Sequence, residues 1–232
     1  MGIYPHLNYT GVVSQGGLRS DAARNRLRLI AAARVVLAER GLHAPLDEIA
    51  RRAEVGNATL YRHFPSRCDL VAAVFADTLR QVVATAEIGL ADPDPWHGFA
   101  QHMEFLCRVQ AGNRALADLL IARVEGSPEL EALRCRAHDR LNRIIRRAQS
   151  AGQLRSEFRH RDVVLVLMAN AGLIERTGLH APNSWRRHLS FVLEGLRADA
   201  TTAVIPSPPS ERSVGAAMAG LAERMGLHGS TG

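Results

Sequence analysis

The chain has 232 residues, of which 47% are hydrophobic, 22% are charged and only 5% are aromatic. This composition is typical of a globular protein and excludes a disordered chain or a collagen-like repeat. The formal net charge is +6, and all 29 basic residues are Arg. Residues 19–67 contain ten Arg and five acidic residues, whereas residues 68–199 contain 17 Arg and 16 acidic residues. A basic excess confined to one short module is the electrostatic signature of a nucleic-acid binder.

The N-terminal part predicts an arm followed by one long helix. Residues 1–18 contain four Gly and little periodicity, which indicates a flexible arm. Ser20 is placed to cap a helix that runs to about Arg40 and stops at Gly41. The apolar positions of this helix approximate a helical stripe. They are Leu27, Ile30, Ala31, Val35 and Leu37.

Two short helices come next. The first begins near Pro45, which is favoured at a helix start, and the second spans about Asn57–His63. The turn Glu54–Gly56 joins them, and Gly56 is free to adopt unusual backbone angles. Ser66 with Asp69 forms a capping box for a fourth helix over about residues 67–90.

The remaining sequence predicts further helices separated by Pro, Gly and Ser. An Asp-Pro-Asp-Pro breaker at residues 92–95 separates the fourth helix from the next. The later helices are expected at about 96–109, 113–124, 128–150, 160–177 and 183–198, and a weak amphipathic helix is expected at 211–226 after a Pro-rich linker. The sequence therefore predicts an all-α fold of about nine helices.

The two short helices and their three-residue turn form a helix-turn-helix pattern. At about 100° per residue, Leu60 and Phe64 lie on one side of the second helix, where they would pack against Ile49. Ala58 and Arg62 fall on the opposite side. This outward face carries no carboxylate, as a helix that enters the major groove of DNA requires.

Individual side chains of this face match groups on DNA. Arg62 can bridge O6 and N7 of guanine, and Ala58 or the Thr59 methyl can contact the methyl group of thymine. Phosphates are the expected partners of three further residues, because phosphate contacts position a helix without reading sequence. These residues are Tyr61, His63 and Arg67.

The segment LDEIARRAEVGNATLYRHFPSRCDL, within residues 24–70, resembles the DNA-binding domain of the tetracycline-repressor (TetR) family. The resemblance implies a homodimer that binds a near-palindromic operator in double-stranded DNA and is released by a small-molecule effector. The family's DNA contacts carry over to Asn57, Ala58, Thr59, Tyr61, Arg62, His63 and Arg67. Two positions depart from the family pattern: Pro45 and its neighbours replace a Ser or Thr that binds phosphate, and Gly56 replaces a polar cap, a role that Asn57 can take over.

With this resemblance the chain divides into four parts. They are an N-terminal arm (1–18), a three-helix helix-turn-helix DNA-binding domain (19–66), a larger helical ligand-binding and dimerisation domain (67–199), and a Pro-rich linker with a C-terminal tail (200–232). The helix over 67–90 joins the two domains and is the expected lever between ligand and DNA.

The expected dimer surface comprises the helices around 161–177 and 184–197, whose apolar residues exceed what one monomer core hides easily. These residues are Val163, Leu167, Leu173, Leu189, Val192, Leu193 and Leu196, and the alternative is that they belong to the monomer core. The expected ligand-pocket residues are Trp96, Met103, Phe105, Leu106, Met168, Asn170 and Trp185, for most of which plain core is again the alternative. Asn170 lies within an apolar run, so its amide needs a partner, either a ligand or the symmetry-related Asn.

Other function classes leave weaker signals. No His pair has i, i+4 spacing and there is no CxxC, so we expect no metal and no cofactor. Redox sensing through Cys68 is an alternative, because a helix start and the adjacent Arg67 both lower a thiol pKa. The sequence holds no GxSxG, P-loop or GxGxxG motif, so an enzyme is not expected. A non-specific DNA-packaging protein would leave the nearly neutral residues 68–199 without a purpose.

Compartment signals agree with a DNA-binding protein. No apolar run reaches the roughly 18 residues that span a bilayer. The N-terminus lacks the basic and then apolar stretches of a secretion signal. Cys68, Cys107 and Cys135 form no disulfide framework, which fits a reducing compartment. We therefore expect a cytoplasmic protein that does not contact membranes.

Overall fold

The structure, a computed structural model, describes residues 15–121, 127–177, 180–200, 206–207 and 209–224 of the chain. These residues form ten helices and no strand, which confirms the all-α prediction. The tenth helix is the weak amphipathic segment. The helices are α1 (Gln15–Arg40), α2 (Leu46–Arg52), α3 (Asn57–His63), α4 (Arg67–Ala91), α5 (Pro95–Gly112), α6 (Arg114–Ile121), α7 (Pro128–Ser150), α8 (His160–Thr177), α9 (Ser184–Leu196) and α10 (Glu211–Arg224).

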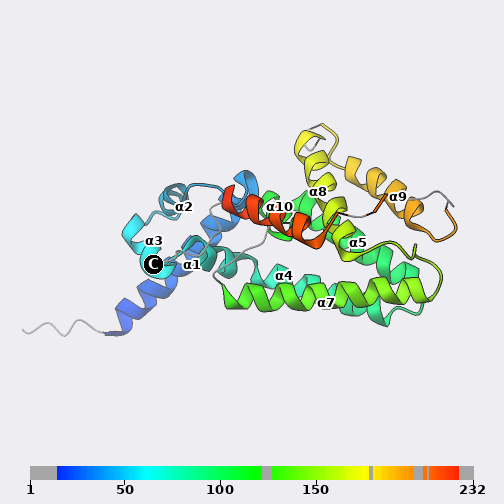
Figure 1. Cartoon of the computed structure of the whole chain (residues 1–232). Coiled ribbons are helices and arrows are strands. Elements are labelled where there is room, and N and C mark those ends of the chain that lie inside the picture. The colour runs from blue at the N-terminus through cyan, green and yellow to red at the C-terminus, as the bar shows by residue number, and fades with distance from the viewer. Residues whose placement is uncertain (1–14, 122–126, 178–179, 201–205, 208, 225–232) are drawn as a thin grey trace, which may run out of the picture.

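The helices form an elongated bundle with the helix-turn-helix at one end (Figure 1). Helices α4 and α7 lie side by side along one edge, and α5 packs on both of them. Helices α8 and α9 pair at the end away from α3, and α10 crosses the middle of the molecule. No helix within the described part of the chain is both long enough and apolar enough to cross a membrane.

The start of α4 is fixed by the predicted capping box. The Ser66 Oγ atom accepts a hydrogen bond from the Asp69 amide at 3.1 Å, and the Asp69 carboxylate accepts the Ser66 amide at 3.0 Å. Both partners satisfy amides that would otherwise lack acceptors at the helix start. At the other end, Arg147 of α7 donates to the carbonyl oxygens of Gly89 and Asp92. Helix α4 is therefore held at both ends.

Helices α4 and α5 approach each other backbone to backbone at two glycines. A Cβ atom added to Gly98 would lie 2.2 Å from the carbonyl oxygen of Gly89, and one added to Gly89 would lie 2.7 Å from the carbonyl oxygen of Gly98. No side chain fits between the helices at this point. The pair of glycines sets the distance between α4 and α5.

Helix α1 differs from its sequence prediction in two ways. It begins at Gln15, so residues 15–18, expected in the flexible arm, are helical; the rest of the arm lies outside the described residues. Its buried face contains Leu29, Ala32, Ala33, Val36 and Leu37, whereas Leu27, Ala31 and Val35 of the predicted stripe are exposed. Because the run around residues 29–37 is apolar in nearly every position, its spacing fits more than one face of a helix.

The hydrophobic core consists of two clusters, and their division does not coincide with residue 66. The first cluster joins α1, α2 and α3 to the first half of α4 and to parts of α6 and α7. The second cluster joins the rest of α4 and α7 to α5, α8 and α9. Phe64 of the helix-turn-helix and Leu119 of α6 belong to the same cluster, so the first three helices and α6 share one packed core.

Candidate functional site

The turn between α2 and α3 is built around a left-handed residue. Glu54 has φ of +54°, and the amide of Val55 donates to the carbonyl oxygen of Ala50 at 3.0 Å, a pattern that closes a helix C-terminus. Gly56, expected to supply the unusual backbone angles, has an extended φ of −74° instead. That expectation was wrong because the left-handed position follows the end of α2, two residues before Gly56.

The recognition helix α3 presents the predicted face to solvent. Leu60 and Phe64 are buried in the same cluster as Ile49, which fixes the rotation of the helix. Asn57, Ala58, Tyr61 and Arg62 are exposed, and Thr59 is half-buried. No acidic residue lies on α3, so nothing on this helix repels a phosphate backbone. The backbone of Gly56 is the N-cap, and no side-chain cap replaces it.

Arg67 occupies a different environment from these residues. Its Nη1 atom donates to the carbonyl oxygens of Leu42 and Ala44, both at 2.7 Å, and burial lowers the pKa of this guanidinium group. Arg67 thus fastens the start of α4 to the loop at residues 41–44, and its phosphate contact stays a prediction. The predicted phosphate contact of His63 also stays a prediction. The Nε2 atom of His63 is buried, and no hydrogen-bond partner for it is found among the described residues.

The same loop is held from the other side by α6. The Asp118 carboxylate accepts the Leu42 amide at 3.0 Å, and Leu42 is fully buried. Gly41 has φ of +80°, and a Cβ atom there would lie 2.7 Å from the Asp118 carboxylate. Only glycine permits both this backbone conformation and this approach. The loop at residues 41–44 therefore connects α1 and α2 to both α4 and α6.

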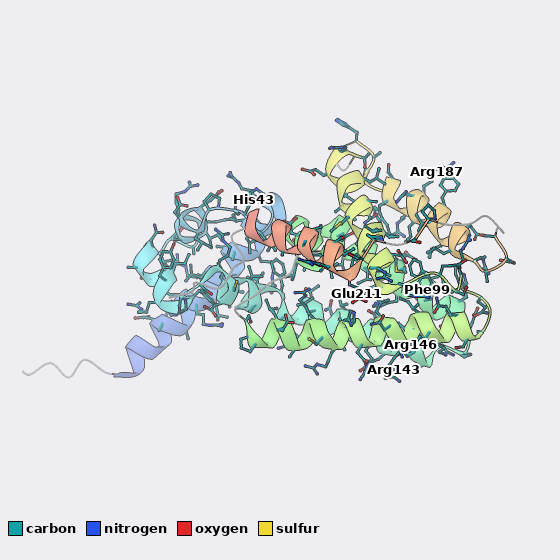
Figure 2. All side chains as sticks on the ribbon, in the orientation of Figure 1. His43, Phe99, Arg143, Arg146, Arg187 and Glu211 are labelled. Carbon is teal, nitrogen blue, oxygen red and sulfur yellow. The ribbon has the colours of Figure 1, made fainter. Side chains whose placement is uncertain are left out.

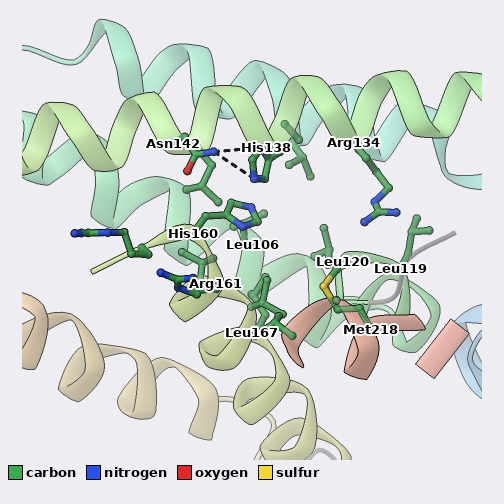
Figure 3. A pocket seen from close by; sticks show the side chains of 18 of the residues that line it. Leu106, Leu119, Leu120, Arg134, His138, Asn142, His160, Arg161, Leu167 and Met218 are labelled. Carbon is green, nitrogen blue, oxygen red and sulfur yellow. Dashed lines mark hydrogen bonds between the residues drawn. The ribbon is translucent and has the colours of Figure 1, made fainter. Parts of the chain in front are cut away.

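A cavity of about 460 Å³ lies between α4, α5, α6, α7, α8 and α10 (Figure 3). Its size is that of a small-molecule site. Its apolar walls come from all six helices and include Leu79, Val82, Leu106, Leu119, Leu120, Leu141, Val163, Val164, Leu167, Val214 and Met218. Its polar side chains are His102, Arg134, His138, Asn142, Arg159, His160, Arg161 and Glu211.

Two histidines of the cavity, His102 and His160, are held in their neutral form. The rings of His138 and His160 lie 4.1 Å apart, and the Asn142 amide contacts His138 (Figure 3). Burial, together with the nearby His138 and Arg134, lowers the pKa of His160 to about 4. Burial likewise lowers the pKa of His102 to about 4, and the Thr85 hydroxyl lies 3.3 Å from its Nδ1 atom. Both imidazole rings are therefore kept neutral mainly because burial disfavours their charged form.

Comparisons with known proteins agree with this architecture. Residues 29–74 match the model of bacterial regulatory proteins of the tetR family, and residues 94–198 match the C-terminal domain of SbtR-like transcriptional regulators. A TetR transcription regulatory protein from Mycobacterium vanbaalenii is 33% identical, over 78% of this chain and 99% of its own, with a TM-score of 0.44. The chain belongs to the TetR family. As such it is a DNA-binding transcription regulator and not an enzyme.

Solved structures of other regulators share the fold of this TetR-family chain. The fatty acid degradation regulator FadR from Bacillus halodurans is 18% identical, over 73% of this chain and 98% of its own, with a TM-score of 0.51. RolR in complex with resorcinol is 22% identical, over 82% of this chain and 98% of its own, with a TM-score of 0.50. No curated protein matches the chain.

One of the seven predicted ligand residues lines the cavity of this regulator. Leu106 lines the cavity, whereas the six others, Trp96, Met103, Phe105, Met168, Asn170 and Trp185, are not among its lining residues. Asn170 is fully buried, and its amide donates to Gln110 at 2.8 Å, so this partner comes from its own chain and is neither a ligand nor a symmetry-related Asn. Its side-chain oxygen has no hydrogen-bond partner among the described residues.

Sequence reasoning missed the polar wall of the cavity. Arg134, His138 and Asn142 of α7 face it at i, i+4 and i+8, and they lie beside the apolar positions Ala137 and Leu141. A polar stripe interrupting an apolar helix face is a signal that helical spacing can reveal.

The predicted dimer residues fall into two groups. Val163 and Leu167 line the cavity, and Leu189 is buried in the second core cluster, so these three serve the monomer. The others, Leu173, Val192, Leu193 and Leu196, are half-buried. On the same two helices the side chains of Leu165 and Phe191 are 41% and 64% exposed. Helices α8 and α9 thus keep apolar surface that the described residues of this chain leave exposed.

The environment of Cys68 differs from the one that the sequence predicts. Cys68 is buried, and this burial, with the Asp69 carboxylate second, raises the pKa of its thiol. The expected lowering of that pKa, on which redox sensing depended, was wrong because desolvation outweighs the adjacent Arg67. Within the described residues no three His, Cys, Asp or Glu side chains gather as metal ligands would.

Proposed function

We propose that this regulator is a homodimeric repressor that binds a near-palindromic operator through α3 and is released when a small molecule occupies the cavity. One observation carries the proposal. Helix α6 supplies Leu119 and Leu120 to the cavity wall, and Asp118 of the same short helix holds the loop at residues 41–44. A ligand that moves this wall therefore acts directly on the DNA-binding module.

The DNA half of the proposal rests on the exposed face of α3. Arg62 and Tyr61 project from a helix without carboxylates, in the module that holds most of the excess positive charge. One recognition helix buries too little surface for a tight specific complex, so two copies are needed. Their helices must lie about 34–36 Å apart to enter successive major grooves on one side of the DNA.

Dimerisation through α8 and α9 would set that spacing. The exposed side chains of Leu165 and Phe191 lie on these helices beside half-buried leucines, at the end of the molecule opposite α3. A second copy of the chain would remove this apolar surface from water. In that arrangement each half of the dimer carries one DNA-binding module.

Two connections would transmit ligand binding to that module. Helix α6 reaches the loop through Asp118, and helix α4 lines the cavity with Leu79 and Val82 while its Arg67 holds the same loop. A coupling of about 1–3 kcal/mol changes operator affinity by about 5–150-fold. Support for a small organic effector also comes from RolR, which shares the fold and was solved in complex with resorcinol.

Selection of binding sites from a random duplex library tests the proposal. The full-length protein is used at about 0.15 M salt, because phosphate contacts alone give strong binding when the salt concentration is low. We expect enrichment of one inverted repeat. Retention of DNA without a consensus, or no retention at all, would contradict the proposal and, in the first case, favour non-specific packaging.

A pair of arginine variants tests the role of α3 on the selected site. Arg62→Ala should weaken specific binding by about 1–3 kcal/mol and relax the preference at one position of each half-site. The matched control is Arg143→Ala, which removes the same charge from the outer face of α7 (Figure 2). Equal specificity in both variants would show that Arg62 does not read a base.

A further inference from the structure

The polar side chains of the cavity gather where α7 faces the beginning of α8. His138 and Asn142 of α7 lie opposite His160 and Arg161, the first two residues of α8 (Figure 3). The Nε atom of Arg161 is buried and has no hydrogen-bond partner among the described residues. A buried guanidinium N–H without an acceptor costs free energy, so this end of the cavity lacks an acceptor group.

The charges around the cavity are mainly positive. Three arginines line it, Arg134, Arg159 and Arg161, against the single carboxylate of Glu211, which is exposed at the start of α10 (Figure 2). Arg159 donates to the carbonyl oxygens of Ser156 and Phe158, so its guanidinium group is engaged outside the cavity. Burial, with smaller contributions from the nearby His138 and Arg134, lowers the pKa of His160. An anion is the charge that this excess of arginine favours.

The rest of the cavity is mainly apolar. Leu106 lies beside His160 and Leu167 near Arg161, whereas Leu120 and Met218 of α10 line the cavity farther from these polar side chains (Figure 3). Val214 of the same helix is buried and also lines the cavity. The cavity of about 460 Å³ thus has a group of polar side chains at the start of α8 and apolar walls beyond them, with Arg134 beside Leu119 and Leu120 (Figure 3).

We propose that the cavity binds an apolar monocarboxylic acid. Its carboxylate lies between His160 and Arg161, and its hydrocarbon body extends along Leu106 and Leu167 beneath α10. A carboxylate accepts hydrogen bonds from the Arg161 guanidinium group and from a ring N–H of His160, and the single charge of Arg161 neutralises it. The inference rests on the proposed function in placing the effector in this cavity, and it adds the chemical class of that effector.

Isothermal titration calorimetry on the full-length protein tests the inference. The probes are straight-chain and phenyl-substituted carboxylates, with octanoate, octanol and octylamine as a set of one chain length and three head groups. We expect at least one carboxylate to bind, and octanoate to bind roughly tenfold or more tightly than octanol. Octylamine should not bind. The inference is overturned when no carboxylate binds, or when octanol binds as tightly as octanoate.

Variants locate the head group. Arg161→Gln should abolish the preference for carboxylate over alcohol, whereas Arg146→Gln, on the outer face of α7, should keep it (Figure 2). A preference that survives Arg161→Gln would place the carboxylate elsewhere and refute the proposed geometry. Melting temperatures of both variants without ligand show whether a loss of binding is merely a loss of folding.

Histidine NMR supplies an independent readout. The titratable and charged groups that line the cavity together with His160 are Arg134 and His138 of α7, Arg159 before α8, Arg161 of its own helix, His102 of α5 and Glu211 of α10. A carboxylate beside it favours the protonated ring, so its pKa should rise from about 4 when octanoate saturates the protein. Since the bound-state pKa is then the higher one, octanoate should bind more tightly as the pH falls through that value. An unchanged pKa of His160 at saturation would refute the contact.

The outcome for the cavity is separable from the outcome for DNA. Octanoate that binds without releasing the selected operator leaves the carboxylate site standing and contradicts the ligand-release half of the proposed function. If the protein binds its operator specifically but binds no carboxylate, the carboxylate site is refuted and the DNA-binding half of the proposed function stands.

Discussion

The left-handed residue in the helix-turn-helix offers a sharp test of the local energetics. Glu54 has φ of +54°, a conformation that costs an L-residue about 1–2 kcal/mol and costs glycine almost nothing. Glu54 also pairs with Arg28 at 2.5 Å, through side chains that are 82% and 41% exposed. An exposed pair of this kind contributes about 0.2–1 kcal/mol. The substitution Glu54→Gly therefore removes a strain and a weak ion pair together.

The control Glu54→Ala removes the same ion pair and keeps the strain. After the greater flexibility of glycine in the unfolded chain is subtracted, about 0.5–1 kcal/mol, Glu54→Gly should be more stable than Glu54→Ala by about 1 kcal/mol. Urea unfolding at one protein concentration measures this as a shift in midpoint at constant slope. Both variants lose one negative charge near the DNA, so their operator affinities should change equally. If Glu54→Ala were as stable as Glu54→Gly, the conformation of this turn would not be strained and the reasoning would fail.

Two substitutions and one labelling experiment test the packing, the coupling and the cysteine. Gly98→Ala places a methyl group against the Gly89 carbonyl and should lower the free energy of unfolding by about 1–3 kcal/mol, whereas Gly112→Ala, which meets open space, should not. Asp118→Ala leaves the buried Leu42 amide without its acceptor and should lower the free energy of unfolding by about 1–3 kcal/mol. Hydrogen exchange at Leu42 should accelerate and operator affinity should fall. Neither quantity should change in the control Asp77→Ala, whose carboxylate is exposed. Because burial raises the pKa of Cys68, a thiol reagent at neutral pH should label the exposed Cys135 in the folded protein and spare Cys68; fast labelling of Cys68 would revive redox sensing.

Local signals made the helix-turn-helix predictable. Ser66 and Asp69 are three residues apart and form the capping box that this spacing predicts, and the bounds of α3 and α8 match the sequence prediction. The rotation of α3 also followed from sequence, because Leu60 and Phe64 are its large apolar residues and one turn separates them. Where few apolar residues compete for one face, helical spacing determines which side is buried.

The same reasoning fails in a helix that is about equally apolar on several sides. In α1 the run from Leu29 to Leu37 contains Ala and Val on nearly every side, so spacing alone does not select the buried face. Contacts with α4 and α6 make that choice. The turn at Glu54 fails for a related reason, since Gly56 is the residue with the greatest freedom but does not occupy the position that needs it.

The cavity shows the remaining limit of sequence reasoning. Large residues such as Trp96, Met103 and Trp185 were reasonable pocket walls, but close packing buries them in the core, because large side chains are what fills space between long helices. The side chains that line the cavity include several medium-sized leucines and the polar stripe on α7. Together the lining residues come from six helices that are far apart in sequence. Which residues remain unpacked depends on what the neighbouring helices fail to fill. A cavity is therefore a property of the whole bundle, and the chemistry of its polar side chains is a better sequence signal for it than residue size.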